Sequence, residues 1–216
     1  MADRSTVSAA RGRHAPPPDV RLHHQRRRLF EAAAAVFARM GYAEASAQAI
    51  SREAGMSKAT FYEHFANKEE CILALFEAAA EQLVRAMARA ANGREHRSYE
   101  ERVTDGVRAL VGALSADPRA ARTLLVEIMG AGPRAVARRD EVLEAFADGL
   151  YRDNARVAPK LDAPTFASPD DAVAVVGATI ELVSRHLRTG RPAEPAALEP
   201  VITRIVLGTL ERARPR

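Results

Sequence analysis

A group of side chains between residues 57 and 68 has the types and spacing that suit contact with a nucleic acid. Lys58 and Thr60 fall on the outer face of a short predicted helix. There an ammonium can donate to guanine O6 and N7, and a methyl group can contact a thymine methyl. Ala59 between them is small enough for the same apolar contact. We therefore predict that residues 58–60 read base edges in a major groove; the alternative is that Lys58 contacts only phosphate.

Two aromatic residues orient the rest of this helix. Phe61 and Phe65 are four residues apart, so both are expected to pack inward. Tyr62 is then turned outward, where its hydroxyl can reach a phosphate. His64 lies near the helix end, either as a second phosphate contact or as a hydrogen-bonded structural group.

Lys68 falls in the first turn of the next predicted helix. The helix dipole disfavours a cation there by about 0.3–1 kcal/mol. A bound phosphate would reverse that penalty, because free backbone N–H groups and the ammonium would both point at it. The alternative is a solvated lysine compensated by Glu69 and Glu70.

Two short helices must position these side chains, and the sequence marks both. Ser46 and Ser57 are predicted N-caps of helices at residues 46–54 and 57–64, each stabilising by about 1 kcal/mol, and their hydroxyls can also meet phosphates. Gly55 between them can adopt the left-handed conformation of a tight turn. This pattern predicts a helix-turn-helix whose second helix fits a major groove.

The remaining sequence predicts an all-α chain of about nine helices. Hydrophobic residues make up 47% and aromatic residues 5% of the 216 residues, and apolar positions recur at helical spacing. The predicted helices span residues 20–40, 46–54, 57–64, 67–92, 99–115, 118–129, 130–156, 169–189 and 194–212.

Charge and composition divide the chain into three parts. Residues 1–19 read as a flexible basic arm, 20–66 as the helix-turn-helix DNA-binding domain and 67–216 as a larger helical domain, for which the family resemblance given below implies effector binding and dimerisation. Residues 1–28 hold seven arginines against two aspartates. Arg27 and Arg28 are therefore predicted to contact the DNA backbone or the minor groove; the alternative is a solvated charge run.

The last two predicted helices carry an apolar stripe at a/d spacing. It consists of Val173, Val176, Gly177, Ile180, Ser184, Leu187, Leu198, Val201, Ile202 and Ile205. Gly177 and Gly208 would allow neighbouring helices to approach closely. Two interpretations stay open: an ordinary core face, or the interface of a four-helix bundle made by two copies of the chain.

Two polar residues interrupt apolar segments of the larger domain. Glu127 lies within Leu124–Met129, and His186 lies beside Leu187. Either is a candidate polar group inside an apolar effector cavity. Glu127 can equally lie on the outer face of its helix.

Several function classes are disfavoured. Cys71 is the only cysteine, so no intrachain disulfide and no Cys/His zinc site are expected. No nucleophile with a neighbouring base and no phosphate-binding glycine loop occurs, so we expect no catalytic residues, metal ligands or cofactor. An apolar targeting segment and an 18-residue apolar run are also missing, which favours a cytoplasmic protein that neither enters nor crosses a membrane.

Residues 22–76 resemble the TetR family of bacterial transcriptional regulators. The resemblance is carried by Leu29, Phe30, Ala33, Phe37, Gly41, Tyr42, Ile50, Ala54, Gly55, Ser57, Thr60, Tyr62, His64, Phe65 and Lys68. The chain departs from the family pattern at Ala45, Ala47, Ser51 and Ala59, and the small Ala47 is expected to pack the second helix less tightly.

This resemblance implies a homodimeric repressor of a palindromic double-stranded DNA operator, released by a small, mostly apolar effector. It also implies phosphate contacts for Tyr62, His64 and Lys68. The alternative is an effector-independent regulator or an activator on the same scaffold.

Overall fold

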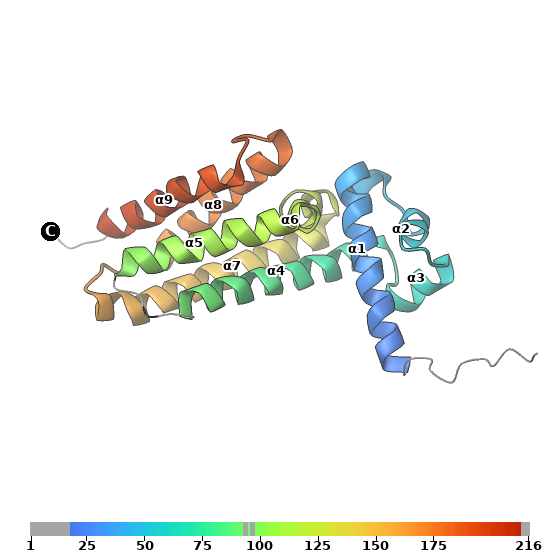
Figure 1. The fold of residues 1–216 in the computed structure, drawn as a ribbon, viewed down its shortest axis with the longest axis horizontal. Helices are drawn as coiled ribbons and strands as arrows, with labels where there is room; N and C mark the ends of the chain where they lie inside the picture. The colour runs from blue at the N-terminus through green and yellow to red at the C-terminus, as the bar shows by residue number, and fades with distance from the viewer. Residues whose placement is uncertain (1–17, 93–94, 96–97, 213–216) are drawn as a thin grey trace, which may run out of the picture.

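The computed structural model describes residues 18–92, 95 and 98–212, and within these ranges the chain folds into nine α-helices and three short 3-10 helices (Figure 1). The predicted all-α fold is confirmed. The predicted arm lies outside the described residues, apart from its last two, which begin the first helix.

Three helices form a small domain at one end of the molecule, the head: α1 (Pro18–Glu44), α2 (Ala47–Glu53) and α3 (Lys58–His64). The predicted break at Gly41 is present, because Gly41 has φ 77° and ψ 163°, and one further turn follows it. Gly55 adopts φ 63°, as the tight turn between α2 and α3 requires.

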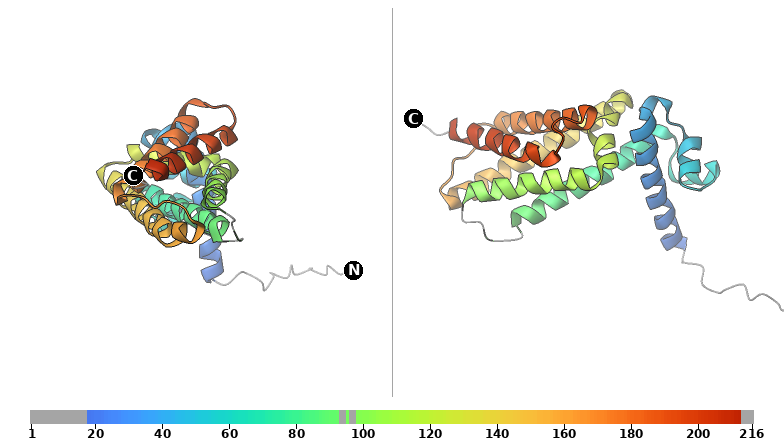
Figure 2. Two further views of the ribbon diagram at one scale, coloured as in Figure 1. Left: turned by 90° about the vertical axis from the view of Figure 1, so that its left-hand side faces the viewer. Right: turned by 45° about the horizontal axis from the view of Figure 1, so that its top comes forward.

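The remaining helices form an elongated bundle, the lobe, that extends from the head (Figure 1). Its helices are α4 (Lys68–Asn92), α5 (Tyr99–Ala116), α6 (Pro118–Leu125), α7 (Pro133–Val157), α8 (Pro169–Thr189) and α9 (Glu199–Arg212), with 3-10 helices η1 (Glu127–Gly130), η2 (Ala158–Leu161) and η3 (Pro195–Leu198). In the end-on view of Figure 2, α8 and α9 lie on one side of the bundle, with α4 and α7 on the other.

Local sequence signals set most helix ends. The Asn67 side chain accepts a hydrogen bond from the amide of Glu70 at 2.9 Å and thereby caps α4, as its position predicts. Asp117 caps α6 in the same way, through the amide of Ala120. Gly190, at φ 66°, ends α8 in the left-handed conformation.

Three predicted helix boundaries need correction. The helix expected at 118–129 ends at Leu125, because Val126 has φ −120° and ψ −59°, and η1 follows. The next helix begins at Pro133 and not at residue 130, since Gly132 has φ 110°. The last helix begins at Glu199, after η3.

One continuous apolar core joins the head to the lobe. In the head it contains Leu29, Phe37, Ile50 and Phe61, each fully buried. Cys71 and Ile72 of α4 belong to the same cluster. α1 also packs against α6 and η1, so the head contacts the lobe at two places. Among the described helices, none is long and apolar enough to cross a membrane.

Candidate nucleic-acid interface

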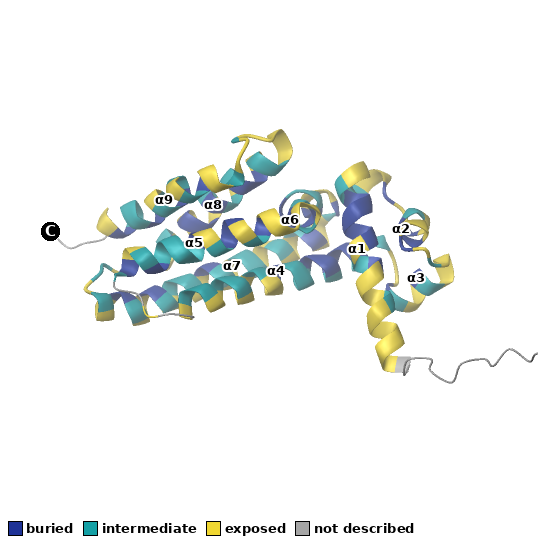
Figure 3. Cartoon of the chain, viewed as in Figure 1, coloured by how far each residue is buried: buried dark blue, intermediate teal, exposed yellow. Residues whose placement is uncertain are grey.

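The N-terminal half of α3 is exposed and held by its cap. The Ser57 hydroxyl accepts a hydrogen bond from the amide of Thr60 at 3.0 Å, and the Ser46 hydroxyl caps α2 through the amide of Ala49 at 3.1 Å. Lys58 and Ala59 are exposed, whereas Thr60 is half-buried with its hydroxyl 3.0 Å from that of Ser57. Figure 3 shows exposed and half-buried stretches along α3. Lys58 and Ala59 are therefore the members of the predicted reading face that are most open to an approaching groove.

The aromatic residues of α3 have the predicted orientation. Phe61 and Phe65 are buried at 0% and 4% exposure, while Tyr62 is 50% exposed. The Lys58 ammonium lies 5.7 Å from the centre of the Tyr62 ring. The two side chains thus form one cationic and hydroxylated patch on the outer face of the helix.

His64 lies at the inner edge of this patch. Its Nε2 atom is buried and has no hydrogen-bond partner among the described residues. Burial lowers the pKa of the imidazole below its ordinary value, Arg26 lowers it further, and Glu63 partly opposes them. The imidazole is consequently neutral at neutral pH in the DNA-free protein.

Lys68 contacts the end of α1. Its ammonium does not form the ion pair with Glu69 or Glu70 that the alternative expects. Its ammonium donates to the carbonyl oxygens of Tyr42 at 2.8 Å and Ala43 at 3.2 Å, and lies 4.2 Å from the centre of the Tyr42 ring. An ammonium has three N–H donors, so one remains for a phosphate. Lys68 therefore connects the start of α4 to the last turn of α1 in the absence of DNA.

The arginines at the start of the head have separate roles. Arg28 donates to the carbonyl oxygen of Ala54 at 2.6 Å and so binds the C-terminus of α2. Arg27 is exposed, 3.8 Å from Glu31. Arg26 lies over the rings of Phe30 and Phe65, at 5.2 and 5.3 Å. Both predicted DNA contacts are exposed, but only Arg28 is bound to the backbone of α2.

Glu127 connects the lobe to the head. Its Oε2 atom accepts a hydrogen bond from the amide of Tyr42 at 3.1 Å, and its Oε1 atom accepts one from Arg122 Nε at 3.0 Å. Arg122 Nη1 also donates to the carbonyl oxygen of Leu187 in α8, at 3.0 Å. The side chain of Glu127 is only 11% exposed. The sequence patterns did not indicate Arg122, because its partners are set by tertiary packing.

His186 lines a small cavity of about 90 Å³ between α5, α6 and α8, closed by η3. The cavity is lined by Val111, Leu114, Ser115, Pro118, Val183, His186, Leu187, Pro195 and Leu198. His186 Nδ1 lies 2.8 Å from the carbonyl oxygen of Pro192. Of the two candidate effector residues, His186 therefore lines a cavity, and Glu127 lies outside this lining.

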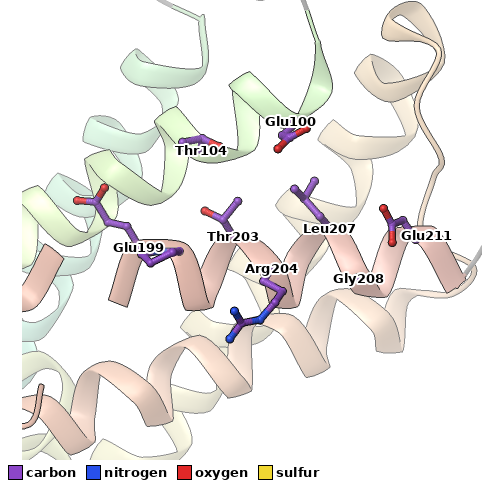
Figure 4. Close-up of a pocket in the computed structure, with 9 residues that line it drawn as sticks. Glu100, Thr104, Glu199, Thr203, Arg204, Leu207, Gly208 and Glu211 are labelled. Carbon is purple, nitrogen blue, oxygen red and sulfur yellow. The ribbon is translucent and has the colours of Figure 1, made fainter. Parts of the chain in front are cut away.

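A larger opening, of about 580 Å³, is an open groove between α5 and α9. In Figure 4, Thr203 and Leu207 of α9 point toward Thr104 of α5, whereas Arg204 points away from it. Glu100, Glu199 and Glu211 also line the groove. Three carboxylates make this groove a poor site for an anionic ligand.

The apolar stripe of α8 and α9 is divided between the core and the surface. Four of its predicted members, Val176, Ser184, Leu198 and Ile202, are buried within one chain, and Leu187 lines the small cavity. Val173 and Gly177 are exposed, and Ile180, Val201 and Ile205 are half-buried. A Cβ atom built at Gly177 or Gly208 meets nothing within 4 Å, so neither glycine serves a close approach within the described chain.

The positions that depart from the family pattern are accommodated in the head. Ala45 and Ala47 are buried at 4% and 9% exposure. Ser51 is 2% exposed, and its hydroxyl donates to the carbonyl oxygen of Ala47 at 2.7 Å. Over the described ranges, no group of three or more His, Cys, Asp or Glu side chains could hold a metal ion.

Comparison with known proteins agrees with this geometry. The family model "Bacterial regulatory proteins, tetR family" matches residues 29–75, which cover most of the head and the start of α4. Among curated proteins, none matches the chain.

Solved structures share the fold of most of the chain, across the head and the lobe. The fatty acid degradation regulator FadR from Bacillus halodurans is 20% identical, with a TM-score of 0.71 over 90% of this chain and 97% of that one. FadR from Bacillus subtilis, solved in complex with stearoyl-CoA, is 18% identical, with a TM-score of 0.73 over 85% and 98%. NalD of Pseudomonas aeruginosa, the secondary repressor of the MexAB-OprM multidrug efflux pump, is 20% identical, with a TM-score of 0.64 over 87% and 96%.

Proposed function

We propose that this chain, whose residues 29–75 match the tetR family model of bacterial regulatory proteins, is a DNA-binding transcription regulator of that family and a homodimeric repressor of a palindromic operator. The observation that carries the proposal is the exposed, capped N-terminal half of α3, which presents Lys58 and Ala59 beside Tyr62. A helix this short covers only a few base pairs, so a second copy is needed to specify a site.

The outer face of α8 and α9 supports a dimer. Val173 and Gly177 are exposed on α8, and Val201 and Ile205 are half-buried on α9. The open space above Gly177 and Gly208 would allow helices of a second copy to approach closely. Two heads in successive major grooves would then lie about 34–36 Å apart.

We propose that a small, mostly apolar effector weakens operator binding. The cavity beside His186 is lined mainly by apolar residues, and one protein of similar fold was solved with stearoyl-CoA. An effector that favours a conformer with mismatched head spacing lowers operator affinity, and DNA must lower effector affinity by the same factor. Long-chain acyl-CoAs are the first effectors to test.

One observation favours the alternative of an effector-independent regulator or an activator. The small cavity, at about 90 Å³, is far below the ~300–1,000 Å³ of typical ligand pockets. Titration of the operator complex with acyl-CoAs separates the two: release of DNA supports the effector-dependent form, and unchanged binding up to millimolar acyl-CoA supports the alternative.

DNA binding is tested with an operator selected by the purified protein from random duplexes. Fluorescence anisotropy should give an affinity that falls steeply with salt, with a log-log slope of about −0.9 per phosphate contacted. Absence of any selected sequence at low salt would overturn the proposal.

Three alanine variants test the assigned residues, and they remove the only three lysines of the chain one at a time. Lys58→Ala should cost about 1–3 kcal/mol on the selected operator and relax its sequence preference, since a base contact is lost. Lys68→Ala should weaken all sequences evenly. Lys160→Ala is the matched control, because Lys160 is exposed in η2 of the lobe, and its binding should equal that of the parent.

A further inference from the structure

A path of side chains runs from the small cavity to the last turn of α1. At the cavity, Leu187 contributes to the lining, and its backbone carbonyl accepts a hydrogen bond from Arg122. This carbonyl is among the last four of α8, which have no partner within their own helix. Arg122 therefore fixes the position of the α8 end as well as pairing with Glu127.

The other end of the path is a break in α1. Gly41 leaves the helical conformation, and the amide of the next residue, Tyr42, donates to Glu127. The carbonyl oxygen of Tyr42 in turn accepts from the Lys68 ammonium at the start of α4. Both polar groups of the Tyr42 backbone are thus bound by side chains from outside α1.

We infer that Arg122 and Glu127 transmit the occupancy of this cavity to the operator-binding head, an inference that rests on the proposed repressor function. A group that enters the cavity displaces Leu187 and removes an acceptor of Arg122. Arg122 then shifts against Glu127, which shares its carboxylate between Arg122 and Tyr42. The last turn of α1, to which Lys68 of α4 also bonds, loses its anchor to the lobe, and the head changes its angle to the lobe.

Two properties of the pair suit it to transmission. The Glu127 side chain is only 11% exposed, so its carboxylate depends on Arg122 and Tyr42 for hydrogen bonds more than on water. Each oxygen of the carboxylate also has a different partner, one in the head and one in the lobe. A movement at one oxygen therefore changes the hydrogen bond at the other.

The test fills the cavity without a known effector. Ser115 lines it from the exposed end of α5, so the thiolate of Ser115→Cys can attack propyl methanethiosulfonate, forming a propyl disulfide and releasing methanesulfinate. The native Cys71 is buried with its pKa raised to about 12 by desolvation, and does not react. Ala116→Cys is the matched control, since Ala116 is exposed on the same helix and absent from the cavity lining.

Propyl disulfide labelling of Ser115→Cys should lower affinity for the selected operator by about 5- to 150-fold, the usual range of allosteric coupling, and the same labelling of Ala116→Cys should not. The effect should disappear in a Glu127→Gln background. A glutamine carbonyl still accepts from Tyr42, but its NH₂ group faces the Arg122 donor and cannot pair with it. An equal loss of affinity in both backgrounds, or no loss after complete labelling of Ser115→Cys, overturns the inference.

Hydrogen exchange gives a second readout that needs no DNA. Labelling of Ser115→Cys should increase amide exchange in residues 41–44, and this increase should be absent in an Arg122→Gln background. Unchanged exchange in residues 41–44 after complete labelling contradicts the path. If the unlabelled protein selects no operator, the proposed repressor function is wrong. Hydrogen exchange in residues 41–44 then tests the path from the cavity to the head independently of DNA binding.

Discussion

At the scale of the residue, His64 is a titratable group of the proposed DNA-binding face whose pKa is shifted by burial. Burial lowers its pKa, so the folded protein favours the neutral imidazole more than the unfolded chain does. Its contribution to stability is complete above the ordinary pKa of about 6.5 and is lost as the pH falls through the lower folded value.

We predict that His64→Gln removes part of the acid sensitivity of folding. Urea unfolding of the parent should show a stability that declines from pH 7.5 to 5, and His64→Gln should decline less. His24→Gln, an exposed position on α1, is the matched control and should follow the parent. Identical pH profiles for His64→Gln and the parent would contradict this role.

DNA acts on the same imidazole with the opposite sign. A phosphate near His64 favours the imidazolium, so the pKa rises in the complex. Operator affinity at constant ionic strength should therefore increase as the pH falls, and less so in His64→Gln.

At the scale of the element, Arg28 of α1 fixes the C-terminal end of α2, which precedes the turn to α3. Its guanidinium donates to the carbonyl oxygen of Ala54 at the C-terminus of α2, where a cation also interacts favourably with the helix dipole. A hydrogen bond to a charged group contributes about 1.5–3 kcal/mol. The helix-turn-helix thus depends on a residue of α1 that lies outside it.

Arg28→Ala should lower the free energy of unfolding by about 1.5–3 kcal/mol. Arg27→Ala on the same helix should cost about 0.5 kcal/mol or less, because its pair with Glu31 is exposed. Chemical denaturation of both variants measures the difference. Equal losses would show that Arg28 does not cap α2.

The helix-turn-helix was predictable because its signals are local. Ser46 and Ser57 bond amides three residues ahead, and the turn between α2 and α3 needs only one left-handed residue, Gly55. The hydrogen bond between Arg28 and Ala54 spans 26 positions, and the one between Tyr42 and Glu127 spans 85. Periodicity and capping patterns carry no information about such pairs, so these two roles required the structure.

The apolar stripe of α8 and α9 shows a related limit. Helical spacing places Val176 and Val173 near the same face, yet Val176 is 4% and Val173 50% exposed. A repeat of apolar residues does not say which members meet the chain's own helices. The packing of α8 against α7 and α9 decides it.

At the scale of the whole molecule, recognition of the proposed palindromic operator requires that two copies associate. Val173→Glu places a charge on the exposed part of the stripe, so we predict that it dissociates the dimer at micromolar concentration and weakens operator binding. Sedimentation velocity measures the association state. Val84→Glu is the matched control, since Val84 is 45% exposed on α4, outside the stripe.

A parent protein that sediments as a monomer at micromolar concentration would contradict the dimer. So would a Val173→Glu variant that sediments like the parent. If the Val84→Glu variant sediments as a monomer, the dimer interface includes α4 instead.

The burial of Cys71 has a consequence for the signals that this regulator can receive. Oxidants such as peroxide react with an exposed thiolate. Cys71 is buried, and desolvation raises its pKa to about 12, so its thiol stays protonated near neutral pH. As the single cysteine of the chain, it also lacks a resolving partner within the same subunit. Oxidative stress therefore has no thiol through which to act on this protein, and its operator binding should be insensitive to the redox state of the cell.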